Sequence, residues 1–151
     1  MRCPFCNVED TQVRDSRPTE DKLSVRRRRF CVECESRFTT IERVQLKDLT
    51  VIKRNGEKKL FDREKIKRSI YTAIRKRQIS EEKIEAIVNS VVREFETSSE
   101  GEILTSSIGE SIMLALSKID QVAYVRFASV YKDFNTAADF EDFINKQLKI
   151  S

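Results

Sequence analysis

The sequence predicts an α+β fold in two parts, a small cysteine-rich β domain followed by a β-hairpin and a helical bundle. Two observations support this class. All four cysteines of the 151-residue chain fall in two Cys-x-x-Cys pairs, Cys3 with Cys6 and Cys31 with Cys34. Later in the chain, apolar residues recur with a period of about 3.6 rather than two. We expect the first domain over residues 1–46 and the second over residues 47–151, with a core at about 49–139.

The two cysteine pairs predict one metal site. A Cys-x-x-Cys turn supplies two thiolates from a tight knuckle, and two knuckles complete the tetrahedral shell of a structural zinc ion. Residues 7–30 separate the pairs and suit a zinc ribbon, in which a β-hairpin joins the knuckles. A catalytic zinc is disfavoured, because the chain has no histidine and four thiolates leave no open position. We expect one Zn²⁺ per subunit, with Cys3, Cys6, Cys31 and Cys34 as its ligands.

Two disulfides or a redox dithiol are the alternative use of these cysteines. The chain opens with Met1 and Arg2 and leads directly into the first pair, so no secretory signal is expected. The remainder is charged and lacks cysteine, which favours a reducing cytosol. Zinc is therefore the favoured interpretation.

Outside the cysteines, the sequence of the first domain predicts the tip of the ribbon, the residues around the metal and the linker to the second domain. Residues 15–21 are polar, contain Pro18 and suit the tip of the ribbon. Phe30, Phe38 and Ile41 are expected to pack around the metal site. Residues 45–48 form the candidate linker to the second domain.

The second domain is expected to begin with a β-hairpin over residues 50–61. Two short strands flank Asn55 and Gly56, a dipeptide that favours a tight hairpin turn because both of its residues accept positive φ.

Five helices are expected after the hairpin. Asp62 is the expected N-cap of the first, Ser80 caps the second, and Asp120 opens the fourth. Residues 97–101 interrupt the helical pattern before the third helix. The apolar faces, in helix order, are Ile66, Ile70 and Ile74; Ile84, Ile87, Val88, Val91, Val92 and Phe95; Ile108, Ile112, Ala115, Leu116 and Ile119; Tyr124, Phe127, Tyr131 and Phe134; and Phe140, Phe143, Ile144 and Leu148.

Charge is informative only locally. The net charge of +4 is shared equally by the two domains, and no transmembrane segment is expected. The run of four arginines at residues 26–29 favours nucleic acid more strongly, because guanidinium groups pair with phosphates and with the O6/N7 edge of guanine. In a strand, alternate arginines point to opposite faces, so two of the four would meet DNA; a solvated charged strand is the alternative. The candidate DNA contacts are Arg14, Arg17, Arg26, Arg27, Arg28, Arg29 and Arg37.

A second basic cluster surrounds the hairpin and could hold a triphosphate. It consists of Lys53 and Arg54 beside the turn, Lys58 and Lys59 after it, and Lys65. The chain has no Walker-type glycine loop, so this is not a P-loop site, and ordinary surface charge is the alternative. Tyr124 and Tyr131 lie seven residues apart on one helical face, where either core packing or adenine stacking would suit them.

These motifs together resemble one known family. The chain is similar to the NrdR family of bacterial transcriptional repressors of ribonucleotide reductase genes, which combine a zinc ribbon with an ATP-cone. The ribbon resemblance rests on the two cysteine pairs and on residues 15–17, 25–29 and 37–40; the ATP-cone resemblance rests on residues 51–56, 61–65 and 124–131.

The resemblance implies a repressor that binds paired operator boxes in double-stranded DNA, while ATP or dATP binds the cone and selects the homo-oligomer. It also implies that Lys53 and Arg54 contact phosphates with help from Lys65, and that Val51 and Tyr131 enclose the nucleoside; Tyr124 is added as a candidate for stacking. The family commonly has an acidic residue where this chain has Lys59, so no contact of that carboxylate is carried over. A bacterial cytoplasmic location, on the nucleoid when DNA is bound, follows from the same resemblance.

Two other classes are weighed against this one. An enzyme is disfavoured, because the chain offers no histidine, no open metal position and no P-loop. The alternative kept open is a zinc-ribbon protein-interaction module whose ATP-cone serves only as a scaffold.

Overall fold

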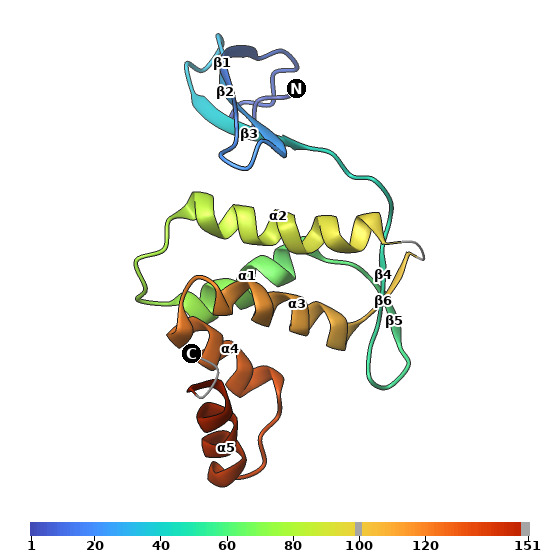
Figure 1. Ribbon diagram of the computed structural model, residues 1–151. Helices are drawn as coiled ribbons and strands as arrows, with labels where there is room; N and C mark the ends of the chain where they lie inside the picture. The colour runs from blue at the N-terminus through green and yellow to red at the C-terminus, as the bar shows by residue number, and fades with distance from the viewer. Residues whose placement is uncertain (99–100, 149–151) are drawn as a thin grey trace. The chain divides into compact units, whose positions relative to one another are not determined.

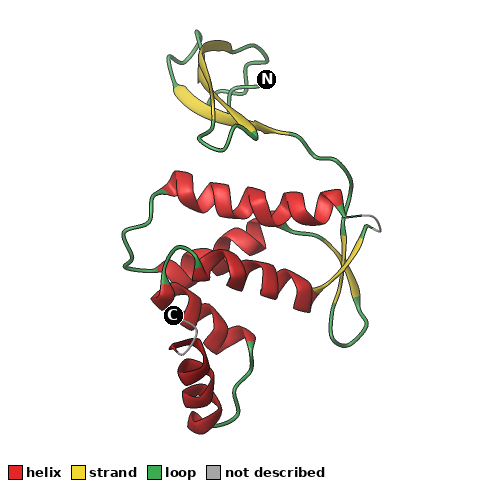
Figure 2. Cartoon of the chain, in the orientation of Figure 1, coloured by secondary structure: helices red, strands yellow, loops and turns green. Residues whose placement is uncertain are grey.

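The computed structural model describes residues 1–98 and 101–148, and the chain divides into two compact units, Met1–Leu46 and Lys47–Ser151 (Figure 1). Within the described residues the first unit contains only strands, whereas the second combines strands with helices (Figure 2). This is the α+β class that the sequence predicts. Residues 99 and 100 of the expected interruption lie outside the described residues.

The first unit is a three-stranded antiparallel sheet. Its strands are β1 (Gln12–Pro18), β2 (Ser24–Phe30) and β3 (Arg37–Arg43), in the order β1-β2-β3. The backbone N–H of Thr19 donates to the carbonyl of Ser24 at 2.9 Å and closes the turn between β1 and β2. The expectation that the tip begins at residue 15 was therefore wrong, because residues 15–18 still pair with β2.

The second unit begins with the expected hairpin, formed by β4 (Thr50–Ile52) and β5 (Lys58–Leu60). Its turn differs from the predicted one. Gly56 N–H donates to the carbonyl of Lys53 at 2.9 Å, so Arg54 and Asn55 are the central residues. Only Gly56 has positive φ, at 81°, and Asn55 instead accepts the Glu57 N–H through its side chain at 3.1 Å. A longer turn with glycine in the left-handed region replaces the predicted two-residue turn.

A third strand, β6 (Glu102–Leu104), was not predicted. It pairs in parallel with β4 and gives the order β5-β4-β6. Its central residue Ile103 is buried, while both of its neighbours are exposed. The hairpin is thereby tied to the start of the third helix.

Five helices follow the pattern of the sequence. They are α1 (Arg63–Ile74), α2 (Glu81–Thr97), α3 (Thr105–Ser117), α4 (Gln121–Tyr131) and α5 (Ala137–Leu148). The side chains of Asp62, Ser80 and Asp120 accept N–H groups in the first turns of α1, α2 and α4, which confirms the three expected caps.

Helix α1 packs against α2 and α4, and α3 packs against the same two helices. The core between them contains Ile70, Val88, Val91 and Leu116, each at most 1% exposed. Two positions expected on helical faces were wrong, because Ile119 lies beyond the end of α3 and is 42% exposed, and Phe134 lies beyond the end of α4. Phe134 instead contacts the rings of Phe140 and Phe143, at 5.4 and 5.3 Å between ring centres. The side chain of Leu148 lies outside the described residues.

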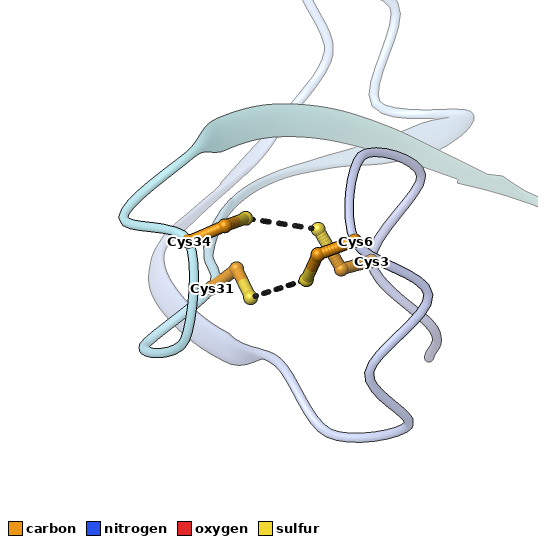
Figure 3. Close-up of side chains that lie close together, drawn as sticks. All are labelled: Cys3, Cys6, Cys31 and Cys34. Atoms are coloured by element: carbon orange, nitrogen blue, oxygen red, sulfur yellow. Dashed lines mark hydrogen bonds between the residues drawn. The ribbon is translucent and has the colours of Figure 1, made fainter.

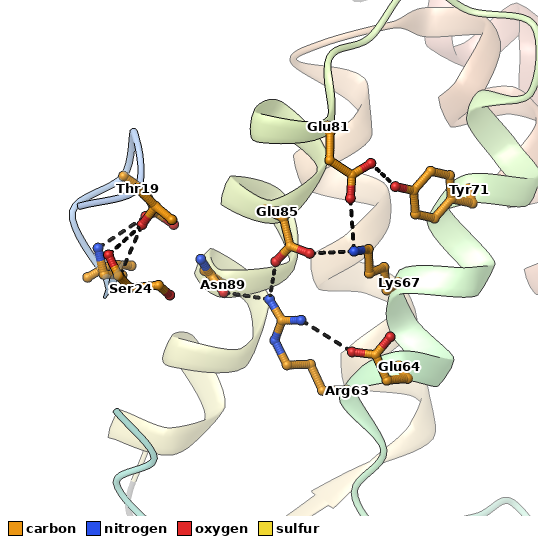
Figure 4. Close-up of polar contacts among 11 residues, drawn as sticks. Thr19, Ser24, Arg63, Glu64, Lys67, Tyr71, Glu81, Glu85 and Asn89 are labelled. Atoms are coloured by element: carbon orange, nitrogen blue, oxygen red, sulfur yellow. Dashed lines mark hydrogen bonds and ion pairs between the residues drawn. The ribbon is translucent and has the colours of Figure 1, made fainter. Parts of the chain in front are cut away.

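A half-buried ionic network joins α1 to α2 (Figure 4). Glu85 accepts from Arg63 at 2.7 Å and from Lys67 at 2.5 Å, and Arg63 also donates to Asn89 at 2.6 Å. These contacts connect the two helices through charged and polar side chains.

In the described part of the chain, every helix is too short or too polar to cross a membrane.

Candidate functional sites

The four cysteines come together in one cluster (Figure 3). Their sulfur atoms all lie within 4.8 Å of one another, and each closest pair, Cys3 with Cys34 and Cys6 with Cys31, is 3.6 Å apart. A disulfide would require about 2.05 Å. All four cysteines are free thiols.

The two knuckles share one backbone design. The residue after the second cysteine of each pair, Asn7 or Glu35, has positive φ, at 62° and 54°. In the first knuckle the backbone N–H of Phe5 donates to the sulfur of Cys3 at 3.4 Å. In the second, Ser36 donates from its side chain and its backbone to Cys34 and lowers the pKa of that thiol to about 6. At Cys6, a backbone hydrogen bond of Val8 favours the thiolate, but burial and the hydrogen bonds with the other three cysteines outweigh it and raise the pKa of that thiol to about 12. Zinc binds the thiolate form of cysteine.

The arrangement fits a tetrahedral zinc ion. With Zn–S bonds of about 2.3 Å, neighbouring sulfurs in a tetrahedron lie about 3.8 Å apart, close to the 3.6 Å of the nearest pairs. Cys3 and Cys31 are fully buried, so the cluster anchors the interior of the small unit. Its four sulfurs would satisfy the ion completely and leave no position for a substrate, as in a structural rather than a catalytic site.

The strand register divides the seven candidate arginines between the two faces of the ribbon sheet. Arg26 lies opposite Arg17 and Ile41, Arg28 lies opposite Thr39, and Arg37 lies opposite Phe30. Directly opposed residues share a face. Arg14 sits at the irregularity in β1, and its guanidinium lies 5.1 Å from the centre of the Phe30 ring, so it joins the same side. We call this side the arginine face; the candidate arginines on it are Arg14, Arg17, Arg26, Arg28 and Arg37, and the register adds Arg43 opposite Ser24.

The five candidate arginines of this face are all exposed. Asp15, which pairs with Arg17 at 3.0 Å, is the only acidic residue that the register of the three described strands places among them. Ile41, expected beside the metal, is instead 44% exposed on this face.

Arg27 and Arg29 point to the opposite face, and both are half-buried. Arg27 pairs with Glu42 at 3.0 Å, and Arg29 donates to the hydroxyl of Thr40 at 3.1 Å. Their guanidinium groups are engaged within the sheet.

A hollow of about 600 Å³ is lined by residues from both faces of the ribbon sheet, because Arg29 and Phe38 lie opposite each other on the face away from Arg28. Arg14, Arg28, Arg29 and Arg37 line it together with Phe30 and Phe38. Four of the seven candidates therefore converge on one concave, basic surface with aromatic walls.

The candidate nucleotide residues are brought together in part. Val51 is half-buried against the core, and Lys53 follows it at the end of β4, where its ammonium pairs with Glu57 at 2.7 Å. Arg54 reaches from the turn to the end of α4, donating to the carbonyl of Tyr131 at 3.4 Å and lying 3.7 Å from Asp133. The hairpin and Tyr131 are thus neighbours, although 77 residues separate Arg54 from Tyr131 in the chain.

Lys65 and Tyr124 occupy different surroundings. Lys65 is exposed in the first turn of α1. Tyr124 packs against the core, and its ring stacks on Phe143 at 5.7 Å between centres. Tyr124 therefore packs in the core, which is one of the two roles expected for it; the other was adenine stacking.

Tyr131 is held on α3. Its hydroxyl donates to the carbonyl of Ser106 at 2.6 Å, and its ring lies against Gly109. Burial, with a smaller effect of Glu110, raises the pKa of the Tyr131 hydroxyl. Gly109, Ser106 and Asp133 were not singled out from the sequence, because only the folded chain brings them to this position.

Fold and site define a protein made of a zinc ribbon and a separate α+β domain with a basic hairpin. A family model described as the NrdR-like N-terminal domain of transcriptional repressors matches residues 1–42, and one described as the ATP cone domain matches residues 49–137. A protein of Acidiphilium cryptum (strain JF-5) named transcriptional repressor NrdR is 59% identical over 144 residues, which cover 95% of each chain. A protein of the same name from Rhodospirillum centenum (strain ATCC 51521 / SW) is 57% identical over 144 residues, which cover 95% of this chain and 94% of that one.

The chain therefore belongs to the NrdR family of transcriptional repressors, with the zinc ribbon and ATP-cone of that family. The resemblance seen in the sequence is confirmed. The names of the relatives describe a regulatory role rather than an enzymatic one, in agreement with the prediction that the chain is not an enzyme.

Proposed function

We propose that this chain represses transcription by binding operator boxes upstream of ribonucleotide reductase genes through its zinc ribbon. ATP and dATP bind the ATP-cone and control both the oligomeric state and DNA binding. The protein acts in the bacterial cytoplasm, on the nucleoid when DNA is bound. Cys3, Cys6, Cys31 and Cys34 hold one Zn²⁺ per subunit in this proposal.

The arginine face is the observation that carries the DNA-binding part. Arg17 and Arg26 lie directly opposite each other on neighbouring strands, an arrangement that destabilises a free sheet because like charges repel. A polyanion relieves this repulsion. Phosphate contacts position a protein on the duplex and guanidinium forks read guanine edges, so exposed arginines suit both tasks.

Operator binding is proposed to need at least two ribbons. A single small module buries limited DNA surface, and paired half-sites are read by paired domains. A nucleotide can shift an oligomer equilibrium only by its differential affinity for the two states. The nucleotide must therefore lie near a surface between subunits or order one.

The proposed nucleotide site is centred on Val51, Lys53, Arg54 and Tyr131, with Lys65 as an accessory cation. The contact of Arg54 with the backbone carbonyl of Tyr131 supports it, because this contact brings the basic hairpin next to the end of α4 that carries Tyr131. Tyr124 is the weaker candidate, since its ring already stacks on Phe143. ATP and dATP differ by one hydroxyl, which a polar site distinguishes by hydrogen bonding.

The test measures mass by light scattering for the zinc-loaded protein without nucleotide, with ATP and with dATP, followed by operator binding in the same three states. We expect both mass and DNA affinity to change with the nucleotide, and the dATP form to bind the operator more tightly. Lys53→Ala should abolish these changes while the ribbon still binds zinc. Constant mass and constant affinity would favour the alternative, a zinc-ribbon interaction module with a scaffold-only ATP-cone.

A further inference from the structure

One carboxylate occupies the middle of the proposed phosphate site. Glu57 pairs with Lys53 at 2.7 Å and with Lys59 at 3.2 Å, so a single acidic side chain bridges two ammonium groups across the hairpin. The hydrogen bond from Lys53, followed by that from Lys59, lowers the pKa of Glu57, and the carboxyl group is therefore charged at neutral pH. The same contact raises the pKa of Lys53.

These three side chains share the face of the hairpin that carries Val51. Val51 lies opposite Lys59 in the register, and Lys53 and Glu57 follow at alternate positions on their two strands. Lys58, by contrast, lies opposite Ile52 on the other face, where it pairs with Glu102 at 2.5 Å. Glu57 thus pairs with two lysines on the face that carries Val51, whereas Glu102 pairs with one lysine on the other face.

We propose that Glu57 is an internal competitor of the nucleotide, a carboxylate that occupies the lysines which the phosphates must reach and so sets nucleotide affinity. The proposal rests on the nucleotide binding proposed above. A phosphate group and the Glu57 carboxylate are both acceptors for the same ammonium protons, and they repel each other. Binding of a polyphosphate therefore breaks or weakens the bridge between Lys53 and Lys59.

The neighbouring cation is held in the same manner. Arg54 lies 3.7 Å from the carboxylate of Asp133 and donates to the carbonyl of Tyr131. Each of the two cations proposed to bind phosphate beside the turn thus has an internal oxygen partner. Glu57 is the stronger competitor, because its contact is shorter and involves two lysines.

Removal of the Glu57 charge leaves the hairpin intact. The hydrogen bonds at the turn, from Lys53 N–H to the Glu57 carbonyl at 2.9 Å and from Glu57 N–H to the side-chain oxygen of Asn55 at 3.1 Å, do not use the Glu57 side chain. Glu57→Gln keeps the shape and removes one charge. Glu102→Gln makes the same change on the opposite face and is the matched control.

The experiment measures dissociation constants of adenosine, AMP, ADP and ATP by calorimetry for the parent chain and for both variants, with and without Mg²⁺. We expect Glu57→Gln to bind ATP about two- to fivefold more tightly, as the loss of one exposed ion pair implies. The gain should shrink from ATP to AMP, vanish for adenosine, and fall at high salt. Glu102→Gln should match the parent.

If the parent binds ATP and Glu57→Gln binds it equally or more weakly, the competitor role is wrong while the proposed nucleotide binding stands. ATP binding that is weaker in Glu57→Gln only when Mg²⁺ is present would make Glu57 a metal ligand instead. A gain that is equal for adenosine, or equal in Glu102→Gln, would also overturn it. Failure of the parent to bind any of the four ligands would overturn the proposed nucleotide function itself, and this inference with it.

Discussion

The ring of Tyr131 lies so close to Gly109 that a Cβ atom at residue 109 would stand 1.9 Å from the ring carbon Cε2. Gly109 is buried within α3, where glycine is unfavourable for helix formation. The missing side chain creates the space in which the end of α4 is seated. Tyr131 then completes the joint with its hydroxyl bond to Ser106, and its carbonyl accepts from Arg54 of the hairpin.

Gly109→Ala should destabilise the second unit by about 1–3 kcal/mol, because a methyl group would overlap the ring and displace Tyr131. At an open helical position the same change stabilises by up to about 1 kcal/mol. Urea unfolding followed by tyrosine fluorescence measures this, since Tyr71, Tyr124 and Tyr131 are the three tyrosines of the chain and all lie in the second unit.

Tyr131→Ala provides the background for the control. If the overlap is the cause, adding Gly109→Ala to Tyr131→Ala should cost nothing further, and a double-mutant cycle would give a coupling energy of that size. A more stable Gly109→Ala single variant would contradict this account of the glycine.

The helices were predictable because each carries its own local evidence. Three capping residues, Asp62, Ser80 and Asp120, mark the N-termini of α1, α2 and α4. The helical spacing of apolar residues continues along the whole of α2. Strand β6 has no such evidence, since three residues are too few for a period, and its parallel pairing with β4 depends on the intervening helices. The turn at Asn55 was misassigned because the same dipeptide suits turns of two lengths.

For the candidate sites, spacing was sufficient to group the cysteines but not to orient the arginines. Alternation predicts that Arg26 and Arg28 share a face, yet which face gathers Arg14, Arg17 and Arg37 depends on the register and on the irregularity in β1. The partners of Arg54 come from the end of α4, a contact between distant segments that no local pattern encodes.

Arg28→Ala should weaken operator binding by about 1–3 kcal/mol if Arg28 reads a base, and should reduce the salt slope by about one if it contacts a phosphate. Arg28 is exposed on the arginine face and lines the basic hollow. Fluorescence anisotropy with labelled operator at several salt concentrations measures both effects.

Arg27→Ala is the matched control from the neighbouring position. It removes the same charge but loses the exposed pair with Glu42, so its cost should appear as less than about 1 kcal/mol of ribbon stability with a smaller loss of DNA affinity. A larger DNA defect for Arg27→Ala than for Arg28→Ala would assign the DNA to the opposite face.

Cys31→Ser should release zinc and unfold the first unit. Cys31 is fully buried, and its sulfur lies 3.6 Å from that of Cys6. Its loss removes one of the four expected zinc ligands from the interior of the unit. Metal analysis should find no stoichiometric zinc, and operator binding should be lost. The tyrosine-monitored unfolding of the second unit should remain unchanged, and retention of one zinc per chain would show that the ligand assignment is wrong.

The network at Glu85 should make the second unit sensitive to acid. Burial alone would raise the pKa of Glu85, but the bonds from Lys67 and Arg63 outweigh it and lower the pKa to about 2. A carboxyl group with a depressed folded-state pKa stabilises the fold above its unfolded pKa of about 4.5, and this contribution is lost as the pH falls toward 2.

Glu85→Gln should cost about 1–3 kcal/mol at neutral pH, because Arg63 and Lys67 lose a charged partner. Its unfolding free energy, followed by tyrosine fluorescence, should fall less than that of the parent between pH 5 and about pH 2. Glu82→Gln, at an exposed position on the same helix, should retain the parental slope, and parallel pH profiles for the parent and Glu85→Gln would disprove the role of the network in acid sensitivity.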